Sequence, residues 1–212
     1  MKIPVYVINL KERTDRLTSI LAEFKDKNEY IVRIKEAIKH ENGGLGLWLT
    51  IREIVKDAVQ EDFDHIIICE DDHVFTEDYE YSKLEGAIQK SSLFELDVLL
   101  GGVSWATDLV KVDEQLFWIK HFSATQFVVM FSRFYETFLN AEITDANSVD
   151  WAISTMTENK MTIFPFISIQ KEFGYSDATP RNNTDGRVAS LFDRAIHKFS
   201  QINKVHERIN RT

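Results

Sequence analysis

The sequence predicts an α/β protein with a mostly parallel central sheet that helices flank. Short runs rich in β-branched and aromatic residues alternate with segments whose apolar residues recur every three or four positions, as strands alternate with amphipathic helices. The first such run is followed by a loop and a helical pattern, the usual opening of an α/β nucleotide-binding unit. The 212 residues suffice for one domain with a full core.

The first half of the chain gives the clearest pattern. A β-rich run at 3–10 predicts a strand, and apolar residues at helical spacing predict a helix from 14 to about 27. A short apolar run at 30–34 predicts a second strand. After a glycine-rich stretch, helical spacing returns at 47–60, and the run at 66–69 reads as a buried strand.

The second half continues the alternation with shorter segments. The same patterns predict strands at 96–100, 117–119, 127–131 and 162–169, and helices at 79–90, 134–139, 149–157 and 191–209. The last helix is amphipathic. We therefore expect a domain at 1–180 and a C-terminal helical extension at 181–212 that packs on it.

The charge is distributed unevenly along the chain. The net charge is −9, but residues 41–180 hold 9 basic and 25 acidic side chains, which gives −16. Residues 1–40 carry +3 and residues 181–212 carry +4. An acidic middle argues against general nucleic-acid binding. The basic ends could meet an anionic ligand or membrane surface, although solvated helix faces explain most such charges.

The chain shows no signal for export or for crossing a membrane. Strand-like residues begin directly after Met1, so we expect no signal peptide and a cytoplasmic protein. Uncharged stretches are shorter than the roughly 18 residues that a membrane span needs. The single cysteine, Cys69, cannot form an internal disulfide, and we expect it to pack as a small apolar residue.

Three carboxylates follow the buried run at 66–69 without a break: Glu70, Asp71 and Asp72. The end of an inner strand lies at the rim of the sheet, where open α/β sheets bind their ligands. Adjacent anions repel one another unless water or a cation neutralises them. The triplet therefore predicts a hard divalent cation that carries a phosphorylated substrate. An acidic, solvated turn explains the same triplet equally well.

The loop after the first strand offers Asn9, Arg13, Asp15 and Arg16. Arginines can form paired hydrogen bonds with a diphosphate. The alternative is that Thr14 or Asp15 caps a helix and that the arginines are solvated. Glycines at 101–102 suit a backbone that approaches a ligand or turns sharply.

Other patterns are weaker or missing. His73 follows the acidic triplet and is either a metal ligand or a local hydrogen-bond partner. Trp105 lies in a polar segment and is the tryptophan that we expect against a sugar ring. The sequence has no cysteine–histidine cluster, no phosphate-binding Gly-x-x-x-x-Gly-Lys loop and no Gly-x-Ser-x-Gly motif.

An ordered set of motifs resembles glycosyltransferase family 25, whose bacterial members act in lipopolysaccharide and lipooligosaccharide biosynthesis. The set runs from about Ile3 to Asp177. Its parts are the Ile-Asn-Leu opening at 8–10 with Arg13 and Asp15-Arg16, Gly43-x-x-Gly46 with Thr50, Glu70-Asp71-Asp72, the strand at 124–132, Val149-Asp150, Pro165, Gln170 and Ser176-Asp177. Leu47 and Ile51 replace a cysteine and a histidine of the family pattern, which leaves the acceptor open.

The resemblance implies a GT-A-like fold and a metal-dependent, inverting glycosyltransferase. Such an enzyme moves a hexose, here galactose by analogy, from a UDP-sugar to a glycan or lipid-linked glycan of the cell surface. The implied cofactor is Mn²⁺ or Mg²⁺. Two alternatives remain: a metal-dependent sugar-phosphate nucleotidyltransferase, or a catalytically silent sugar-binding protein of the same fold.

The resemblance also suggests roles for particular residues. Asp72 and Asp71 are the expected metal ligands. Asp150 is the first candidate for the base, because a helix N-terminus favours a carboxylate, although N-capping explains it almost as well; Asp177 is the second. The expected contacts to the nucleotide-sugar are Asn9, Leu10, Arg13, Arg16, Glu70, Asp71 and Gly102.

The terminal helix has three readings. Basic residues beside its apolar stripe would let it lie on an anionic membrane where lipid-linked acceptors are found, as a peripheral contact at the inner face. It could equally pack on the sheet or pair in a dimer, and packing is the default.

Overall fold

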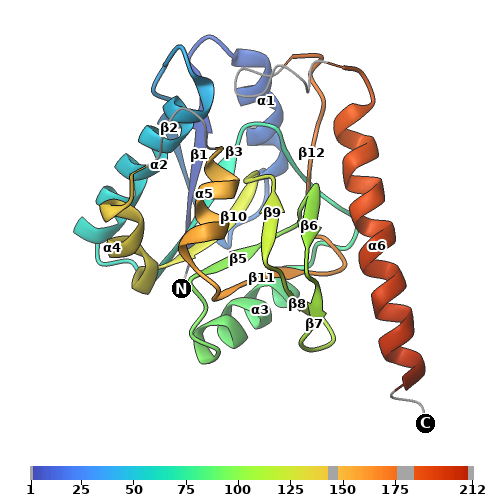
Figure 1. Ribbon diagram of the computed structural model, residues 1–212. Helices are drawn as coiled ribbons and strands as arrows, with labels where there is room; N and C mark the ends of the chain where they lie inside the picture. Colours follow the sequence, from blue (N-terminus) through green and yellow to red (C-terminus); the bar gives the residue numbers. More distant parts are fainter. Residues whose placement is uncertain (1, 143–147, 176–183, 210–212) are drawn as a thin grey trace.

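The computed structural model describes residues 2–142, 148–175 and 184–209. Within them the chain forms an eight-stranded sheet of order β2-β1-β3-β10-β5-β11-β8-β7 (Figure 1). The strands are β1 (Ile3–Asn9), β2 (Tyr30–Glu36), β3 (His65–Glu70), β4 (His73–Phe75), β5 (Val98–Leu100), β6 (Trp105–Thr107), β7 (Val110–Lys111), β8 (Leu116–Trp118), β9 (His121–Ser123), β10 (Phe127–Phe131), β11 (Lys160–Ile163) and β12 (Ser168–Gln170). The helices are α1 (Thr14–Glu23), α2 (Gly43–Gln60), α3 (Tyr81–Leu93), α4 (Ser132–Asn140), α5 (Val149–Met156) and α6 (Arg187–Ile209).

The sheet is mostly parallel in strand direction. β1 pairs parallel with β2 and β3, and β5 pairs parallel with β11. β10 and β8 run antiparallel to both of their neighbours, so the other six of the eight strands share one direction. The expected α/β fold, with a mostly parallel sheet flanked by helices and a C-terminal helix, is confirmed.

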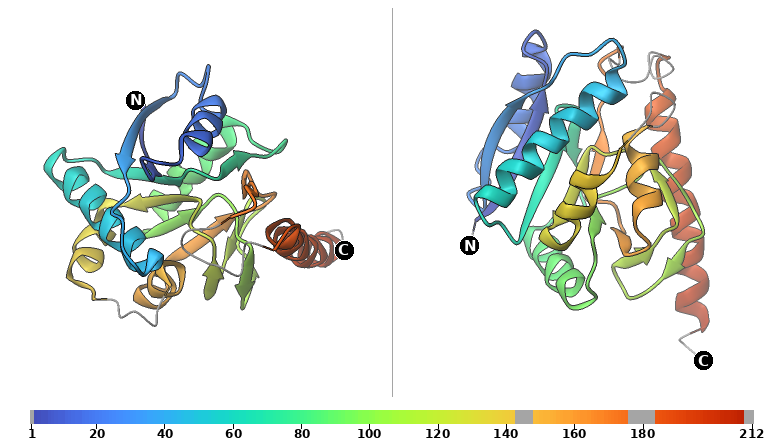
Figure 2. Two further views of the ribbon diagram at one scale, coloured as in Figure 1. Left: turned by 90° about the horizontal axis from the view of Figure 1, so that it is seen from above. Right: turned by 60° about the vertical axis from the view of Figure 1, so that its left-hand side comes forward.

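Both faces of the sheet are buried, which explains why its inner strands are continuous apolar runs. Along β3, Ile66 and Ile68 face a core that α2, α4, α5 and α6 cover. Ile67 and Cys69 face the other core, which α1 and α3 cover. Figure 2 shows helices on both sides of the sheet. Cys69 is fully buried, as expected.

Two small ribbons stand apart from the main sheet. β4 pairs with β12, and β6 pairs with β9, both antiparallel. The sequence pattern did not predict β4, β6, β7 or β9. The strand expected at 162–169 is two strands, β11 and β12, with a cis Phe164–Pro165 peptide bond between them. The β6–β9 ribbon lies between α5 and α6 (Figure 1).

Three helices begin earlier than the pattern predicted, and α4 does so by two residues, at Ser132. α2 starts at Gly43 instead of residue 47, because the Asn42 side chain caps it by accepting from Leu45 N. Gly46 lets the first turn of α2 pack closely against Ile38, since a Cβ at residue 46 would lie 2.4 Å from the Ile38 carbonyl oxygen. α6 starts at Arg187 instead of residue 191.

The terminal helix shares the core of the main body. Its residues Val188, Phe192, Ala195 and Phe199 are buried in the core on the α2 side of the sheet. Its C-terminal part extends past the rest of the molecule (Figure 1). The division into residues 1–180 and 181–212 stays a prediction, as does a membrane contact. None of the described helices is long and apolar enough to cross a bilayer.

Candidate active site

The order of the strands places a ligand site at the carboxyl ends of β1 and β3. From β1 the chain passes through α1 to β2 on one side, and then through α2 to β3 on the other side. The connection after β1 and the connection before β3 therefore run in opposite directions along the sheet, which makes the point between β1 and β3 a switch point. Open α/β sheets bind ligands at such a switch point. Asn9 ends β1 there, and Glu70 ends β3.

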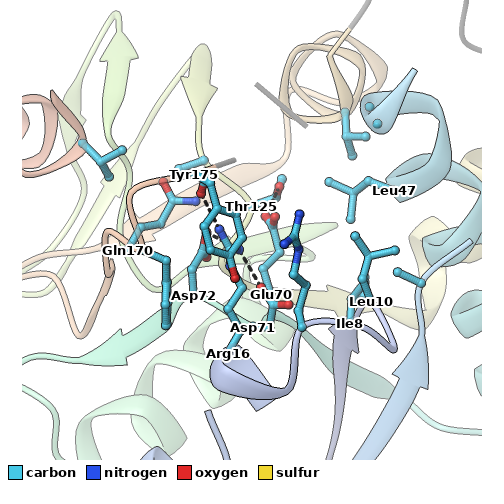
Figure 3. A pocket seen from close by; sticks show the side chains of 18 of the residues that line it. Ile8, Leu10, Arg16, Leu47, Glu70, Asp71, Asp72, Thr125, Gln170 and Tyr175 are labelled. Atoms are coloured by element: carbon cyan, nitrogen blue, oxygen red, sulfur yellow. Dashed lines mark hydrogen bonds and ion pairs between the residues drawn. The ribbon is translucent and has the colours of Figure 1, made fainter. Parts of the chain in front are cut away.

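A cavity of about 700 Å³ opens at this point. Its walls come from the ends of β1, β3 and β12, the loop after β9, and the first turns of α2, α5 and α6. Figure 3 shows a polar side with the acidic triplet and Arg16, facing an apolar side with Ile8, Leu10 and Leu47. The cavity thus offers different surfaces to the two ends of a ligand.

A buried ion pair organises the polar side. Arg16 is only 8% exposed, and its Nη1 donates to Asp71 Oδ1 at 2.8 Å. Asn9 Nδ2 donates to Asp71 Oδ2 at 2.7 Å, so both oxygens of Asp71 are engaged. Arg16 also lies 3.6 Å from Asp72 Oδ2. The protein therefore supplies a cation of its own to the triplet.

A short segment of the chain covers this ion pair. Arg16 Nη2 donates to the Tyr175 carbonyl at 2.7 Å, and its guanidinium lies 4.7 Å from the Tyr175 ring centroid. Arg13 lies over the same ring at 4.2 Å. Tyr175 OH donates to Asp15. Burial alone would lower the pKa of Arg16, but the hydrogen bond and charge of Asp71, with the charge of Asp72, raise it.

The other two carboxyl groups of the triplet are held less completely. Asp72 Oδ1 is buried and has no hydrogen-bond partner among the described residues. Burial raises the pKa of Asp72 to about 6, although the Arg16 charge works against the shift. Glu70 accepts from Thr125 Oγ1 at 2.6 Å. Burial, with the charge of Asp72, raises the pKa of Glu70 to about 8.

The donor set fits a hard divalent cation that is shared with a ligand. An unpaired carboxylate oxygen on Asp72 and the neighbouring Glu70 supply oxygen ligands, which Mg²⁺ and Mn²⁺ prefer. Within the described residues, no group of three or more His, Cys, Asp and Glu side chains forms a ready-made metal site. Two carboxylates suit Mg²⁺, which takes much of its coordination from phosphates and water.

The loop between β9 and β10 connects the triplet to the start of α5. Ala124 has φ of 93°, a left-handed conformation that is strained for alanine. Its N–H donates to Asp150 Oδ2 at 3.0 Å, and the next residue, Thr125, holds Glu70. Ser148 Oγ donates to Asp150 Oδ1. Asp150 thus lies in the cavity wall at the N-terminus of α5, with both oxygens hydrogen-bonded.

The structure brings most of the predicted residues together, with exceptions. Leu10, Arg13, Arg16, Glu70, Asp71, Asp72 and Asp150 line the cavity. Asn9 lies behind it and acts through Asp71. Gly102 does not line the cavity: a Cβ there would lie 2.2 Å from the Ser168 carbonyl oxygen, so glycine permits the packing of β12. Asp177 lies outside the described residues.

His73 is not in the cavity wall either. It is buried, and its Nδ1 lies 2.7 Å from Ser168 Oγ. Burial lowers the pKa of His73 to about 3, which keeps the ring neutral. Of the two roles that the sequence offered for His73, this environment is that of a local hydrogen-bond partner.

Thr125 and Tyr175 belong to the site and were not expected from the sequence. Their roles depend on contacts across 55 and 159 positions, to Glu70 and Arg16 respectively. No local pattern marks such residues. No sequence pattern predicts the strained backbone at Ala124 either.

Comparison with known proteins supports the fold and leaves the family open. No family model and no curated protein matches the sequence, so the resemblance to family 25 stays a prediction. A197 from STIV has a similar structure, with a TM-score of 0.55 at 13% identity over 81% of this chain and 86% of that chain. At that identity the likeness shows the fold alone.

Two further solved structures are less similar. An apo UDP-glucose pyrophosphorylase gives a TM-score of 0.45 at 9% identity, over 94% of this chain and 81% of that chain. HddC from Yersinia pseudotuberculosis gives 0.44 at 11% identity, over 92% and 78%. Likenesses at this level carry no argument about activity.

Proposed function

We propose that the protein is a metal-dependent hexosyltransferase that takes a nucleotide-sugar as donor. One observation carries the proposal: a cavity at the β1–β3 switch point combines an unpaired Asp72 carboxylate oxygen with an apolar wall. The carboxylate suits the cation that accompanies a diphosphate. The apolar wall suits the flat face of a nucleobase.

Each side of the cavity has a role in holding the donor. Asp72, assisted by Glu70, would hold Mn²⁺ or Mg²⁺, which supplies charge neutralisation for a nucleoside diphosphate leaving group. Leu10, Ile38 and Leu47 would enclose the base. Arg16 forms ion pairs with Asp71 and Asp72 and so orients these carboxylates. Its predicted contact to the diphosphate stays a prediction.

Asp150 is the proposed base. An acceptor hydroxyl that attacks the sugar must lose its proton, and a carboxylate within hydrogen-bond reach can take it. The Ala124 N–H and the Ser148 hydroxyl orient the Asp150 carboxylate in the cavity wall. Asp177 stays the second candidate.

A sugar-phosphate nucleotidyltransferase is the second candidate function. Basic side chains of Arg13, Lys171 and Arg187 also line the cavity. A nucleoside triphosphate and a sugar phosphate together carry more negative charge than a nucleotide-sugar does, so these cations favour that pair of substrates. The same carboxylates would hold the cation.

Product analysis separates the two activities. The protein is incubated with UDP-galactose, Mn²⁺ and a mixture of saccharide acceptors, and separately with UTP, Mn²⁺ and galactose 1-phosphate. Release of UDP in the first reaction supports the hexosyltransferase, and release of pyrophosphate in the second supports the alternative. Asp72→Asn should lower whichever activity is present by about 10²–10³-fold, whereas Asp193→Asn, on the exposed face of α6, should not change it. Absence of both products, with wild type and variants alike, would contradict the proposal.

A further inference from the structure

Two exposed tryptophans lie at the β6–β9 ribbon: Trp105 on its outer face and Trp151 on the adjoining helix α5. Trp105 lies opposite Ser123 and Thr107 lies opposite His121 in the ribbon, so these four side chains share one face. The alternate residues Ala106 and Phe122 are buried in the core. From α5, Trp151 stacks on His121, with ring centroids 4.6 Å apart and an interplanar angle of 16°. We call Trp105, Thr107, His121 and Trp151 the aromatic platform.

The rings of the platform are open to solvent. Trp105 is 44% exposed and Trp151 is 43% exposed. Large rings on a surface lose the free energy that burial would give them, so neighbouring exposed tryptophans often indicate a binding site. The other tryptophans of the chain, Trp48 and Trp118, are buried or half-buried.

The platform continues directly from the cavity. Ser104 and Ser123 line the cavity, next to Trp105 in sequence and across the ribbon. Asp150, the proposed base, immediately precedes Trp151. The ribbon lies between α5 and α6, whose first turns also line the cavity (Figures 1 and 2). A molecule on the platform therefore approaches the cavity from the side of Asp150.

The chemistry of the platform suits a carbohydrate. The C–H-bearing face of a hexose stacks on the electron-rich face of an aromatic ring, and its hydroxyls need hydrogen-bond partners. The Ser123 side chain lies opposite Trp105 on the same face of the ribbon and in the cavity wall, where its hydroxyl can supply one. The charged residues next to the platform in sequence, Asp108 and Lys120, have opposite signs and lie 4.0 Å apart, so their charges offset each other, which favours a neutral ligand.

We propose that the aromatic platform binds the acceptor, a neutral glycan of at least two sugar units. Two separate ring faces, on Trp105 and on the Trp151–His121 pair, favour more than one sugar. The inference rests on the proposed function, because the word acceptor presupposes a donor in the cavity. Carbohydrate binding at the platform is a separate physical claim and can be measured without turnover.

The test is a titration of the full chain with neutral disaccharides (lactose, cellobiose, maltose and chitobiose), followed by calorimetry and by saturation-transfer NMR. The variants are Trp105→Ala, Trp151→Ala and their combination. Phe94→Ala is the matched control, since that ring is 47% exposed and follows α3, which packs in the core on the opposite face of the sheet from the ribbon. UDP with Mn²⁺ is titrated into each protein as well.

We expect at least one disaccharide to bind, and the double variant to weaken that binding by about tenfold or more, as loss of ring contacts does at binding sites. UDP affinity should be unchanged in every variant, and Phe94→Ala should match the wild type. If no disaccharide binds, or if the double variant binds as well as the wild type, the platform proposal is wrong. If disaccharides bind through the platform but UDP does not bind at all, the proposed function fails and the carbohydrate surface stands.

Discussion

Two regions of the site, which we call its first and second sides, hold their functional groups in different ways. At the ends of β1 and β3, Asn9, Arg16 and Asp71 fix one another through buried hydrogen bonds. On the second side, at β9 and α5, the tryptophans present open ring faces, and Asp150 is held by two backbone N–H groups and one hydroxyl.

The difference indicates two kinds of ligand. Charged side chains that are already paired and buried need not rearrange when an ionic ligand binds, because the free-energy cost of burying and ordering them arises on folding. Open rings suit an uncharged ligand that gains from stacking. The first side therefore matches a nucleoside diphosphate with its cation, and the second matches a sugar chain.

Removing the Arg16 side chain from the first side should have the largest effect on the free energy of unfolding. Arg16→Ala leaves Asp71 buried with only Asn9 as partner, and loss of one member of a buried pair costs about 3–5 kcal/mol. Urea unfolding measures the loss. Adding Asp71→Asn to Arg16→Ala should restore a large part of it. A loss below about 1 kcal/mol, the value typical of surface pairs, would show that the ion pair does not organise this side.

Asp72→Asn should affect activity more than folding. It removes the charge of the unpaired oxygen that we assign to the cation, so turnover of the active donor should fall by about 10²–10³-fold, equivalent to about 3–4 kcal/mol. The melting temperature of the ligand-free protein should not fall, since burial disfavours the charged form of Asp72, as its raised pKa of about 6 indicates. Initial rates and thermal unfolding give the two values. Retention of activity within a few-fold would place the cation elsewhere.

The raised pKa of Glu70 predicts a pH-dependent stability. Its ordinary value is 4.5 and its value in the fold is about 8, so the folded state prefers the protonated form. The resulting stabilisation is complete below pH 4.5 and is lost as the pH rises to about 8.

Glu70→Gln removes this titration. Its melting temperature should match the wild type at pH 5 and exceed it by several degrees at pH 8, given about 2–4 °C per kcal/mol for a domain of this size. Melting curves without added metal at both pH values measure the difference. A difference that does not change with pH would contradict the assigned shift.

The smallest effect on the free energy of unfolding is expected on the second side, at Ala124. Glycine adopts φ of 93° without the strain that alanine carries, but it also gains freedom in the unfolded chain. We expect Ala124→Gly to stabilise the protein by about 0.5–1 kcal/mol and Ala124→Val to destabilise it by more. Chemical unfolding of both variants gives the sign. If glycine destabilises the protein, the loop is not strained as described.

The two sides also differ in how well the sequence predicts them. β1, α1, β2, α2 and β3 follow one another with strong apolar periodicity, so their existence and the position of the acidic triplet could be inferred. Arg16 and Asp71 were both identified, but their pairing was not, because it depends on how α1 packs against the end of β3.

The second side is built from contacts that local patterns do not carry. β6 and β9 have three residues each, and their pairing joins Trp105 to Ser123, 18 positions later. Such short strands have no measurable alternation. The sequence nevertheless singles out Trp105, which lies in a polar segment, as a residue that faces a sugar, and this stays a prediction; no pattern singled out Trp151.

The central claim is that the end of β3 binds a divalent cation together with a diphosphate. Calorimetric titration of UDP into the protein, with Mn²⁺ and then with excess EDTA, tests it most directly. We predict binding that requires Mn²⁺, that is weaker for UMP, and that is lost in Asp72→Asn. Binding of UDP that is unchanged by EDTA and by Asp72→Asn, or no binding under either condition, would contradict the claim.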